Sequence, residues 1–275
     1  MNIGTKKFDI KNRTYIMGIL NVTPDSFYDG GRYNAVDSAL FRAEEMLKEG
    51  ADIIDIGGES TRPGHTQISI AEEIARVAPI IQAVKSSVDI PVSCDTYKAE
   101  VAAAAIEAGA DMINDIWGFR HENNLNMSNI VAKSGTCCVL MHNKSVAEYQ
   151  NFIPDVLNDL SVSLQIAQNA GISKDKIILD PGIGFGKTAR QNLTCLAHIE
   201  QFIKVGYPLL IGASNKSFIG AALGLETPQR HEATLAVTAH AAIAGAAFVR
   251  VHDVLANKRV VALIEAIKAS KEQND

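Results

Sequence analysis

The segment Lys176–Thr188 (KIILDPGIGFGKT) combines a carboxylate, a lysine and a glycine-rich turn. A short apolar run leads into Asp180, which is typical of a β-strand that is buried on both faces. The Pro–Gly pair ends that strand, and the glycines allow the backbone to turn sharply and to approach a ligand closely. Asp180 alone could simply cap nearby backbone N–H groups. A functional role is favoured because similar polar residues follow other predicted strands.

These polar residues occur where the other predicted strands end. They are Asn21, Glu59, Thr61, Arg62, Asp95, Asn114, His142, Lys216, Arg250 and His252. A carboxylate can accept two parallel N–H bonds from the edge of a nitrogen-rich ring, as it does from arginine. The arginines and hydroxyl groups suit phosphate oxygens, and Lys216 and Ser217 begin a helical stretch whose N-terminus also attracts anions. The set predicts a pocket for a flat, nitrogen-rich heterocycle that carries a phosphate tail.

Short apolar strands alternate with helices along the whole chain, with no linker between them. The strands are Tyr15–Leu20, Asp52–Ile56, Pro91–Cys94, Asp111–Ile113, Thr136–Met141, Lys176–Asp180, Leu209–Gly212 and Ala247–Val251. The helices are Val36–Glu49, Ile70–Ser86, Lys98–Ala108, Met127–Lys133, Pro154–Ala170, Leu193–Lys204, Glu232–Ala244 and a last helix that ends near Ala269. This alternation implies parallel pairing through right-handed crossovers.

We therefore predict an α/β fold with one domain over residues 1–275, a single (β/α)8 TIM barrel with its active site at the C-terminal ends of the strands. An open doubly wound sheet is the alternative, but the chain has neither a GxGxxG turn nor a Walker loop to support it. The repeats EGAD (Glu49–Asp52) and EAGAD (Glu107–Asp111) predict left-handed glycines that end helices at the opposite side of the barrel.

Composition excludes several classes of protein. The net charge of −5 argues against a general nucleic-acid binder, which usually has a basic face. The four cysteines lack metal-like spacing, and the adjacent Cys137 and Cys138 predict buried thiols on opposite faces of a strand. No signal peptide and no apolar run of about 18 residues is present, so a cytoplasmic enzyme without a membrane partner is expected.

Seven segments, in consistent order from about residue 14 onward, resemble the dihydropteroate synthase family. They are Gly18–Gly31 (GILNVTPDSFYDGG), Asp55–Gly64 (DIGGESTRPG), Ser93–Thr96 (SCDT), Ile113–Gly118 (INDIWG), Leu179–Thr188 (LDPGIGFGKT), Ala213–Gly220 (ASNKSFIG) and Arg250–Val254 (RVHDV). The resemblance implies a transferase of folate biosynthesis. It would join (7,8-dihydropterin-6-yl)methyl diphosphate (dihydropterin pyrophosphate) to 4-aminobenzoate (p-aminobenzoate), with Mg²⁺ and loss of pyrophosphate. The family mechanism is dissociative, so it needs electrostatic stabilisation more than a nucleophilic side chain.

The resemblance also implies roles for individual residues. The pterin-binding residues would be Asp95, Asn114, Asp180, Lys216 and Arg250, all of them catalytic except Asn114. The pyrophosphate-binding residues would be Asn21, Thr61, Arg62, Arg250 and His252, and Asn21 would also contact the metal. The p-aminobenzoate pocket, where sulfonamides would also bind, would comprise Phe27, Pro63, Phe185, Lys216 and Ser217. Val22–Asn34 and Glu59–Gln67 resemble the loops that close over the site, and the last helices would form a homodimer.

One residue departs from the family pattern. Asn215 stands where the family often has arginine, so the charge and the planar guanidinium are lost. We expect this difference to affect how the p-aminobenzoate carboxylate and its sulfonamide mimics are bound. The assignment of the pterin residues does not depend on it.

Three other functions fit parts of the pattern. A corrinoid methyltransferase binds a pterin in a similar barrel but needs no pyrophosphate site, so Thr61 and Arg62 argue against it. A non-catalytic pterin-binding barrel is disfavoured by the intact Lys216, Arg250 and His252. A sugar-phosphate isomerase would need a strand-end Glu or a His–Lys base pair beside the substrate carbon, and we find no such arrangement.

Overall fold

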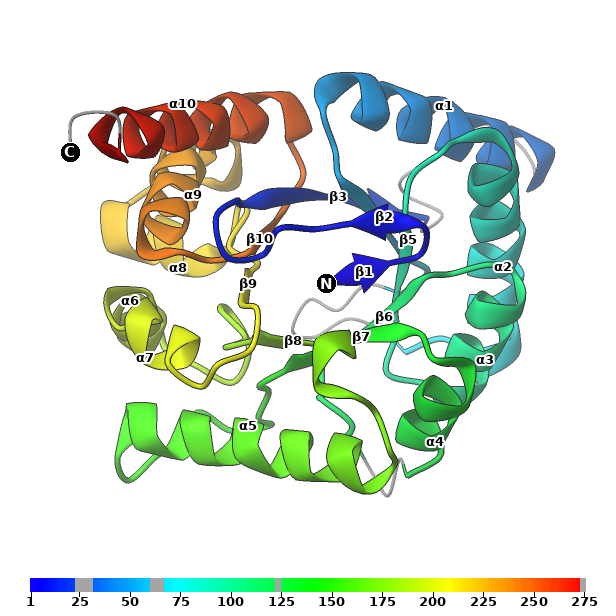
Figure 1. The fold of residues 1–275 in the computed structure, drawn as a ribbon, viewed down its shortest axis with the longest axis horizontal. Helices are drawn as coiled ribbons and strands as arrows, with labels where there is room; N and C mark the ends of the chain where they lie inside the picture. The colour runs from blue at the N-terminus through cyan, green and yellow to red at the C-terminus, as the bar shows by residue number, and fades with distance from the viewer. Residues whose placement is uncertain (23–31, 60–66, 122–124, 273–275) are drawn as a thin grey trace.

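The apolar segments predicted as strands pair in one parallel sheet in the computed structural model, which describes residues 1–22, 32–59, 67–121 and 125–272. The strands are β3 (Tyr15–Asn21), β4 (Ile53–Gly57), β5 (Val92–Asp95), β6 (Met112–Asp115), β7 (Cys137–Met141), β8 (Ile177–Asp180), β9 (Leu210–Ile211) and β10 (Phe248–Val251). Their order is β8-β7-β6-β5-β4-β3-β10-β9, and a parallel bridge between Leu179 and Leu209 closes the circle. Helices surround the strands (Figure 1), which confirms the predicted (β/α)8 barrel.

The α-helices are α1 (Arg32–Glu49), α2 (Ile70–Ser87), α3 (Ala99–Glu107), α4 (Leu125–Ser134), α5 (Phe152–Asn169), α6 (Ala189–Ala197), α7 (Ile199–Ile203), α8 (Ser217–Leu223), α9 (His231–Ala244) and α10 (Val254–Glu272). The predicted single helix over Leu193–Lys204 is wrong. Thr188 forms a capping box with Gln191, so α6 begins four residues earlier. His198 then leaves the helical conformation, with φ −120° and ψ 29°, and divides the segment into α6 and α7.

The register of the sheet brings the polar strand ends to one edge. Asn21 pairs with Gly57, Gly57 pairs with Asp95, and Asp95 pairs with Asn114. Farther around the barrel, Asp180 ends β8 opposite Met141. Because all the strands are parallel, their carboxyl ends form one rim, and the polar residues after them face a common space.

The opposite end of the barrel is covered by an element that no pattern in the sequence predicted. Strands β1 (Asn2–Ile3) and β2 (Lys6–Lys7) form an antiparallel hairpin, which Figure 1 shows in front of the barrel strands. Ile3 and Phe8 are buried against the first residues of the barrel strands, Tyr15 and Phe248 among them. The rings of Phe8 and Tyr15 meet edge to face with centroids 4.7 Å apart. The hairpin therefore closes the N-terminal end of the barrel with an apolar plug.

We expect Phe8→Ala to lower the free energy of unfolding by about 3–5 kcal/mol, since it deletes a buried ring and leaves a cavity. Urea unfolding followed by circular dichroism measures this loss. Phe41→Ala is the matched control, because that ring is 61% exposed and its removal should change stability by less than about 1 kcal/mol. Equal effects of the two substitutions would contradict the role of the plug.

The predicted left-handed glycines are confirmed at the same end of the barrel. Gly50 and Gly109 have φ values of 97° and 105°. Each is followed two residues later by an aspartate, Asp52 or Asp111, whose carboxylate accepts a backbone N–H of a neighbouring strand segment and a lysine side chain. These interactions fix the point where the chain re-enters the barrel.

The four cysteines, Cys94, Cys137, Cys138 and Cys195, are buried free thiols, which confirms the prediction made for Cys137 and Cys138. Cys137 belongs to the cluster inside the barrel, whereas Cys138 packs in the cluster beneath the helices, so the two point to opposite faces of β7. None of the helices in the described residues combines the length and apolarity that crossing a membrane requires.

Candidate active site

Four strand-end residues predicted to act together do lie together at the C-terminal rim. Asp95 ends β5, Asn114 lies on β6, Asp180 ends β8 and Arg250 lies on β10. The first three are 5%, 4% and 5% exposed, so they form the floor of the rim rather than its edge.

Arg250 joins this cluster through two buried carboxylates. Its Nε donates to Oδ2 of Asp55 and its Nη2 donates to Oδ2 of Asp95, both at 2.5 Å. Asp55 also accepts a hydrogen bond from Nδ2 of Asn114, at 3.1 Å. Burial acts to lower the pKa of Arg250, but the two carboxylates outweigh it and raise that pKa above its usual range. Arg250 is therefore a permanent cation at the centre of the site.

Two carboxylate oxygens here have no donor. In the part of the chain that the structure describes, Oδ1 of Asp55 and Oδ1 of Asp95 are buried without a hydrogen-bond partner. Burial raises the pKa of Asp95 to about 7, although Arg250 opposes the rise. An acceptor left unpaired in a buried position is costly unless a ligand supplies the donor. The arrangement therefore suits a ligand that presents N–H groups.

Asp180 faces the same space from the other side of the barrel. Its Oδ1 accepts the backbone N–H of Gly182 at 2.7 Å, which fixes the side chain. A Cβ placed on Gly212 would lie 3.8 Å from Oδ2 of Asp180 and 3.7 Å from Cβ of Arg250. Gly212 thus keeps the space between these two residues open. Burial raises the pKa of Asp180, and Lys216 partly offsets this effect.

Lys216 reaches from the start of α8 to the glycine-rich turn that follows β8. Its Nζ donates to the carbonyl oxygen of Ile183 and lies 4.5 Å from the centre of the Phe185 ring. A Cβ on Gly184 would lie 2.6 Å from Cδ of Lys216, so only glycine leaves room for the side chain. Desolvation lowers the pKa of Lys216 to about 7, while Asp180 works in the opposite direction. Lys216 is therefore a proton-exchanging group at neutral pH.

The remaining predicted residues divide into two groups. Asn21, His252 and Ser217 lie on the rim: Asn21 and Ser217 are exposed, and Nδ1 of His252 lies 2.9 Å from Oγ of Ser214. Those of the first loop and most of the second, namely Phe27, Thr61, Arg62 and Pro63, lie outside the described residues.

Asn215 adopts a left-handed backbone conformation, with φ 56°. Asparagine tolerates this region better than most residues. Its backbone N–H donates to Oγ1 of Thr234 at 3.1 Å, and its Oδ1 accepts from the same hydroxyl at 3.4 Å. The amide therefore turns toward α9.

Two features near the rim were not recognised from the sequence. Asp55 sits inside the apolar run DIIDI, and a charge in a strand buried on both faces was the signal that could have found it. Lys98 forms a buried ion-pair network with Glu59 and Glu73, at distances of 2.6 and 2.7 Å.

His142 was predicted as a rim residue, but it is fully buried. Its ring nitrogens lie 3.2 Å from Asp159 and 2.8 Å from Lys187.

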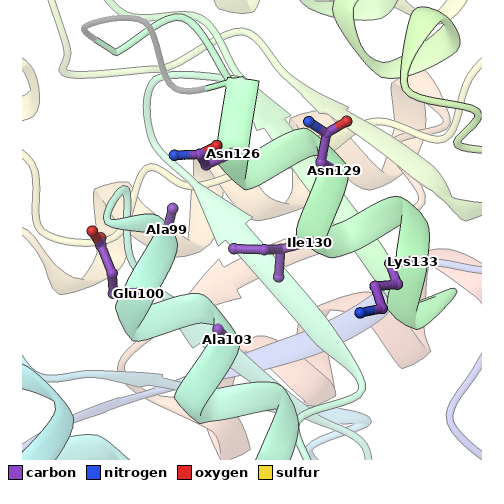
Figure 2. Close-up of a pocket in the computed structure, with 7 residues that line it drawn as sticks. All are labelled: Ala99, Glu100, Ala103, Asn126, Asn129, Ile130 and Lys133. Carbon is purple, nitrogen blue, oxygen red and sulfur yellow. The ribbon is translucent and has the colours of Figure 1, made fainter.

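A separate groove of about 420 Å³ lies between α3 and α4. Figure 2 shows its lining residues, which come from the two helices: Ala99, Glu100, Ala103, Asn126, Asn129, Ile130 and Lys133. None of them belongs to the strand-end cluster, and the groove does not offer the paired carboxylates described above.

Known proteins are similar to this chain in sequence and in fold. The family described as "Pterin binding enzyme" matches residues 17–252. A dihydropteroate synthase of Clostridium beijerinckii is 54% identical over 268 residues, which cover 97% of this chain and 99% of that protein. The crystal structure of a dihydropteroate synthase from Clostridium difficile in the presence of pteroic acid has a TM-score of 0.91 at 45% identity, and the match covers 95% of this chain and 99% of that one. A Xanthomonas albilineans dihydropteroate synthase with 4-aminobenzoic acid has a TM-score of 0.88 at 41% identity over 94% of each chain.

Proposed function

The chain belongs to the pterin-binding enzymes and, within them, to the dihydropteroate synthases, and we propose from this membership how its residues divide the reaction. The enzyme is a transferase of folate biosynthesis. It condenses (7,8-dihydropterin-6-yl)methyl diphosphate with 4-aminobenzoate and releases diphosphate. The C–O bond to the diphosphate breaks, the amine nitrogen forms the new C–N bond, and that nitrogen then loses a proton.

The pterin ring binds on the floor of the rim, against Asp95, Asn114 and Asp180. The observation that carries this assignment is the buried Oδ1 of Asp95, which has no donor among the described residues. The amidine-like edge of a pterin presents parallel N–H groups that would pair with such carboxylates. Arg250, held by Asp55 and Asp95, would cover the ring with its charge directed at the diphosphate.

The charge balance of the floor favours a dissociative reaction. Three carboxylates, those of Asp55, Asp95 and Asp180, face two basic groups, those of Lys216 and Arg250. When diphosphate leaves, the pterin methylene carries positive charge that is delocalised over the ring. Fixed carboxylates in a site of low dielectric constant stabilise this charge without reorganisation.

Asn21, Thr61, Arg62, Arg250 and His252 are proposed to hold the diphosphate. The partly buried His252 is set by Ser214, and its ring lies on the rim next to the end of β10. Loops 22–34 and 59–67 would exclude water from the cation once substrate is bound.

We also propose that the reaction uses Mg²⁺. Mg²⁺ keeps several waters and binds through one or two protein oxygens together with substrate phosphates. The exposed amide of Asn21 at the end of β3 fits this mode. The described residues contain no group of three His, Cys, Asp or Glu side chains able to hold a metal by themselves, so the fit is to an ion carried by the diphosphate. Such an ion would neutralise negative charge on the leaving group.

The p-aminobenzoate pocket is proposed to lie beside Phe185, Lys216 and Ser217, with Phe27 and Pro63 as further wall residues. The ring of Phe185 under the ammonium of Lys216 supports this position. An aromatic amine could stack there while its carboxylate faces the exposed start of α8 at Ser217. Sulfonamides, which mimic this substrate, would occupy the same pocket.

The test is release of diphosphate by the purified protein. Release should require p-aminobenzoate and Mg²⁺ and should yield dihydropteroate. Pterin diphosphate binding without turnover would support a non-catalytic barrel instead. Methyl transfer from a methyl-tetrahydropterin to a corrinoid protein would support the methyltransferase.

Substrate binding at pH 8 is expected to take up protons through Lys216. With a pKa of about 7, the free side chain is mostly neutral at pH 8. The anionic diphosphate raises that pKa, because it favours the charged form, so the amine gains a proton. Asp95 contributes little, since a carboxyl with a pKa of about 7 is already mostly ionised at pH 8. Calorimetry in two buffers of different ionisation enthalpy measures the uptake. The same uptake in Lys216→Gln would contradict the assignment.

We further propose that residues 1–275 act as one pterin-binding domain, since the first and last barrel strands, β3 and β10, pair directly. The protomer would form a homodimer through its last helices. Exposed apolar side chains support this surface: Ile243 on α9 and Leu263 and Ile267 on α10, helices that lie side by side in Figure 1. A cytoplasmic location is supported by the four free thiols, which suit a reducing compartment.

A further inference from the structure

Lys187 ends the glycine-rich turn after β8, and none of the roles assigned above uses it. Its Nζ lies 2.8 Å from Nδ1 of His142, 3.0 Å from the carbonyl oxygen of Gly182 and 3.1 Å from that of Phe185. An ammonium group has three donors, so each is matched by one acceptor. Desolvation lowers the pKa of Lys187 to about 8. The chain thus keeps a half-buried cation at this turn.

His142 supports the lysine from behind. Because an ammonium group can only donate, Nδ1 of His142 must accept, and the ring proton lies on Nε2, which faces Asp159 at 3.2 Å. Desolvation lowers the pKa of His142 to about 2, so the ring stays neutral and keeps this acceptor. Asp159 is itself held by Lys144 and Arg120, at 3.5 and 3.6 Å.

The turn that Lys187 contacts forms hydrogen bonds with two charged residues of the site, Asp180 and Lys216. The N–H of Gly182 fixes Asp180, and the carbonyl oxygen of Ile183 accepts from Lys216. Phe185 lies under the same ammonium. Lys187 bonds to the carbonyl oxygens of Gly182 and Phe185, which flank this stretch. One side chain therefore bonds to both ends of the stretch that contacts Asp180 and Lys216.

The turn has little freedom to find another position. A Cβ on Gly182 would lie 1.8 Å from the carbonyl oxygen of His142, so the two backbones are in direct contact. The hydroxyl of Tyr149 donates to the carbonyl oxygen of Gly186 at 2.7 Å. A displacement of the turn would therefore pass directly to Asp180.

We propose that Lys187, supported by His142 and Asp159, is a positioning residue that presents Asp180 and Lys216 to the pterin. It touches no substrate group itself. The inference rests on the proposed pterin-binding roles of those two residues. A half-buried ammonium with three acceptors specifies one geometry of the turn, which an apolar side chain of similar length would not do.

A double-mutant cycle tests this role. Dissociation constants for the pterin diphosphate are measured by calorimetry, without p-aminobenzoate, for wild type, Lys187→Met, Asp180→Asn and the double variant. Lys187→Met should weaken binding roughly tenfold in the wild-type background and less than about threefold in the Asp180→Asn background. Lys85→Met is the matched control, because its ion pair with Asp111 lies at the opposite end of the barrel. It should leave the dissociation constant unchanged.

A tenfold loss in both backgrounds, or a lower Tm with unchanged binding, would overturn the proposal. If Lys187→Met does not fold, Asp159→Asn replaces it in the same double-mutant cycle. This substitution removes the carboxylate that holds His142 and leaves the turn itself unchanged. Absence of pterin binding and turnover in the wild type would contradict the proposed function itself, and the inference with it. Normal turnover in the wild type with an additive cycle would overturn the inference alone.

Discussion

Asp180→Asn is expected to lower kcat/KM by about a thousandfold or more while the protein stays folded. The amide keeps the size of the side chain and an oxygen for the Gly182 N–H, at present 2.7 Å away. It loses the charge-assisted bonds to the pterin and one carboxylate that stabilises the developing cation. Each effect is worth roughly a factor of 10 to 1,000. Diphosphate release under saturating p-aminobenzoate measures the change.

The stability of Asp180→Asn, in contrast to its activity, should not fall. Burial raises the pKa of Asp180 in the folded protein, so ionisation of this group opposes folding above that pKa. Removing the charge should leave the free energy of unfolding at pH 7 unchanged or slightly higher. Asp175→Asn, at the exposed entry to the same strand, is the matched control and should keep full activity. A folded Asp180→Asn variant with near-normal kcat/KM would exclude Asp180 as the pterin anchor.

Arg250→Met should be the most destabilising single change at the rim. It leaves two carboxylates, on Asp55 and Asp95, buried and facing each other without their cation. Breaking a buried ion pair from one side costs about 3–5 kcal/mol. Urea unfolding at pH 7 measures the loss.

The pH dependence of this loss has a definite sign. Arg250 lowers the pKa of Asp95, so without it the folded-state pKa of that carboxyl rises further and the folded protein binds more protons than the unfolded chain above about pH 4. The variant should therefore recover stability relative to wild type as the pH falls from 7 to about 5. Adding Asp55→Asn to Arg250→Met should recover part of the lost free energy of unfolding at pH 7. A loss that neither low pH nor the second substitution relieves would point to lost packing rather than unpaired charge.

The rim was predictable from the sequence because strand ends are marked by a change in chemistry. Apolar runs stop at Asp95, Asn114 and Asp180, and parallel pairing brings such stops to one edge. Asp55 was hidden because it precedes its strand end by two residues. Its charge makes sense only once Arg250, nearly two hundred positions later, lies beside it.

The β1–β2 hairpin and the break between α6 and α7 were not predicted for a different reason. The β1–β2 hairpin has two residues per strand and a polar composition, so no periodic pattern marks it. It is stabilised by burial of Ile3 and Phe8 against the barrel, which is a tertiary effect. The break between α6 and α7 at His198 likewise follows no glycine or proline signal. The apolar spacing continues across it.

The weakest strand junction of the barrel affects how easily a protease can cut the protein. Among the described residues, β8 meets the β9 segment through the single bridge between Leu179 and Leu209, whereas every other neighbouring pair of barrel strands shares at least two paired residues. Asp180 follows one side of this junction and Lys216 the other. A pterin held by both would hold the junction shut, and a ligand that binds only the closed barrel stabilises it by mass action. Pterin binding would then raise the resistance of the protein to proteolysis, because it lowers the population of the open form.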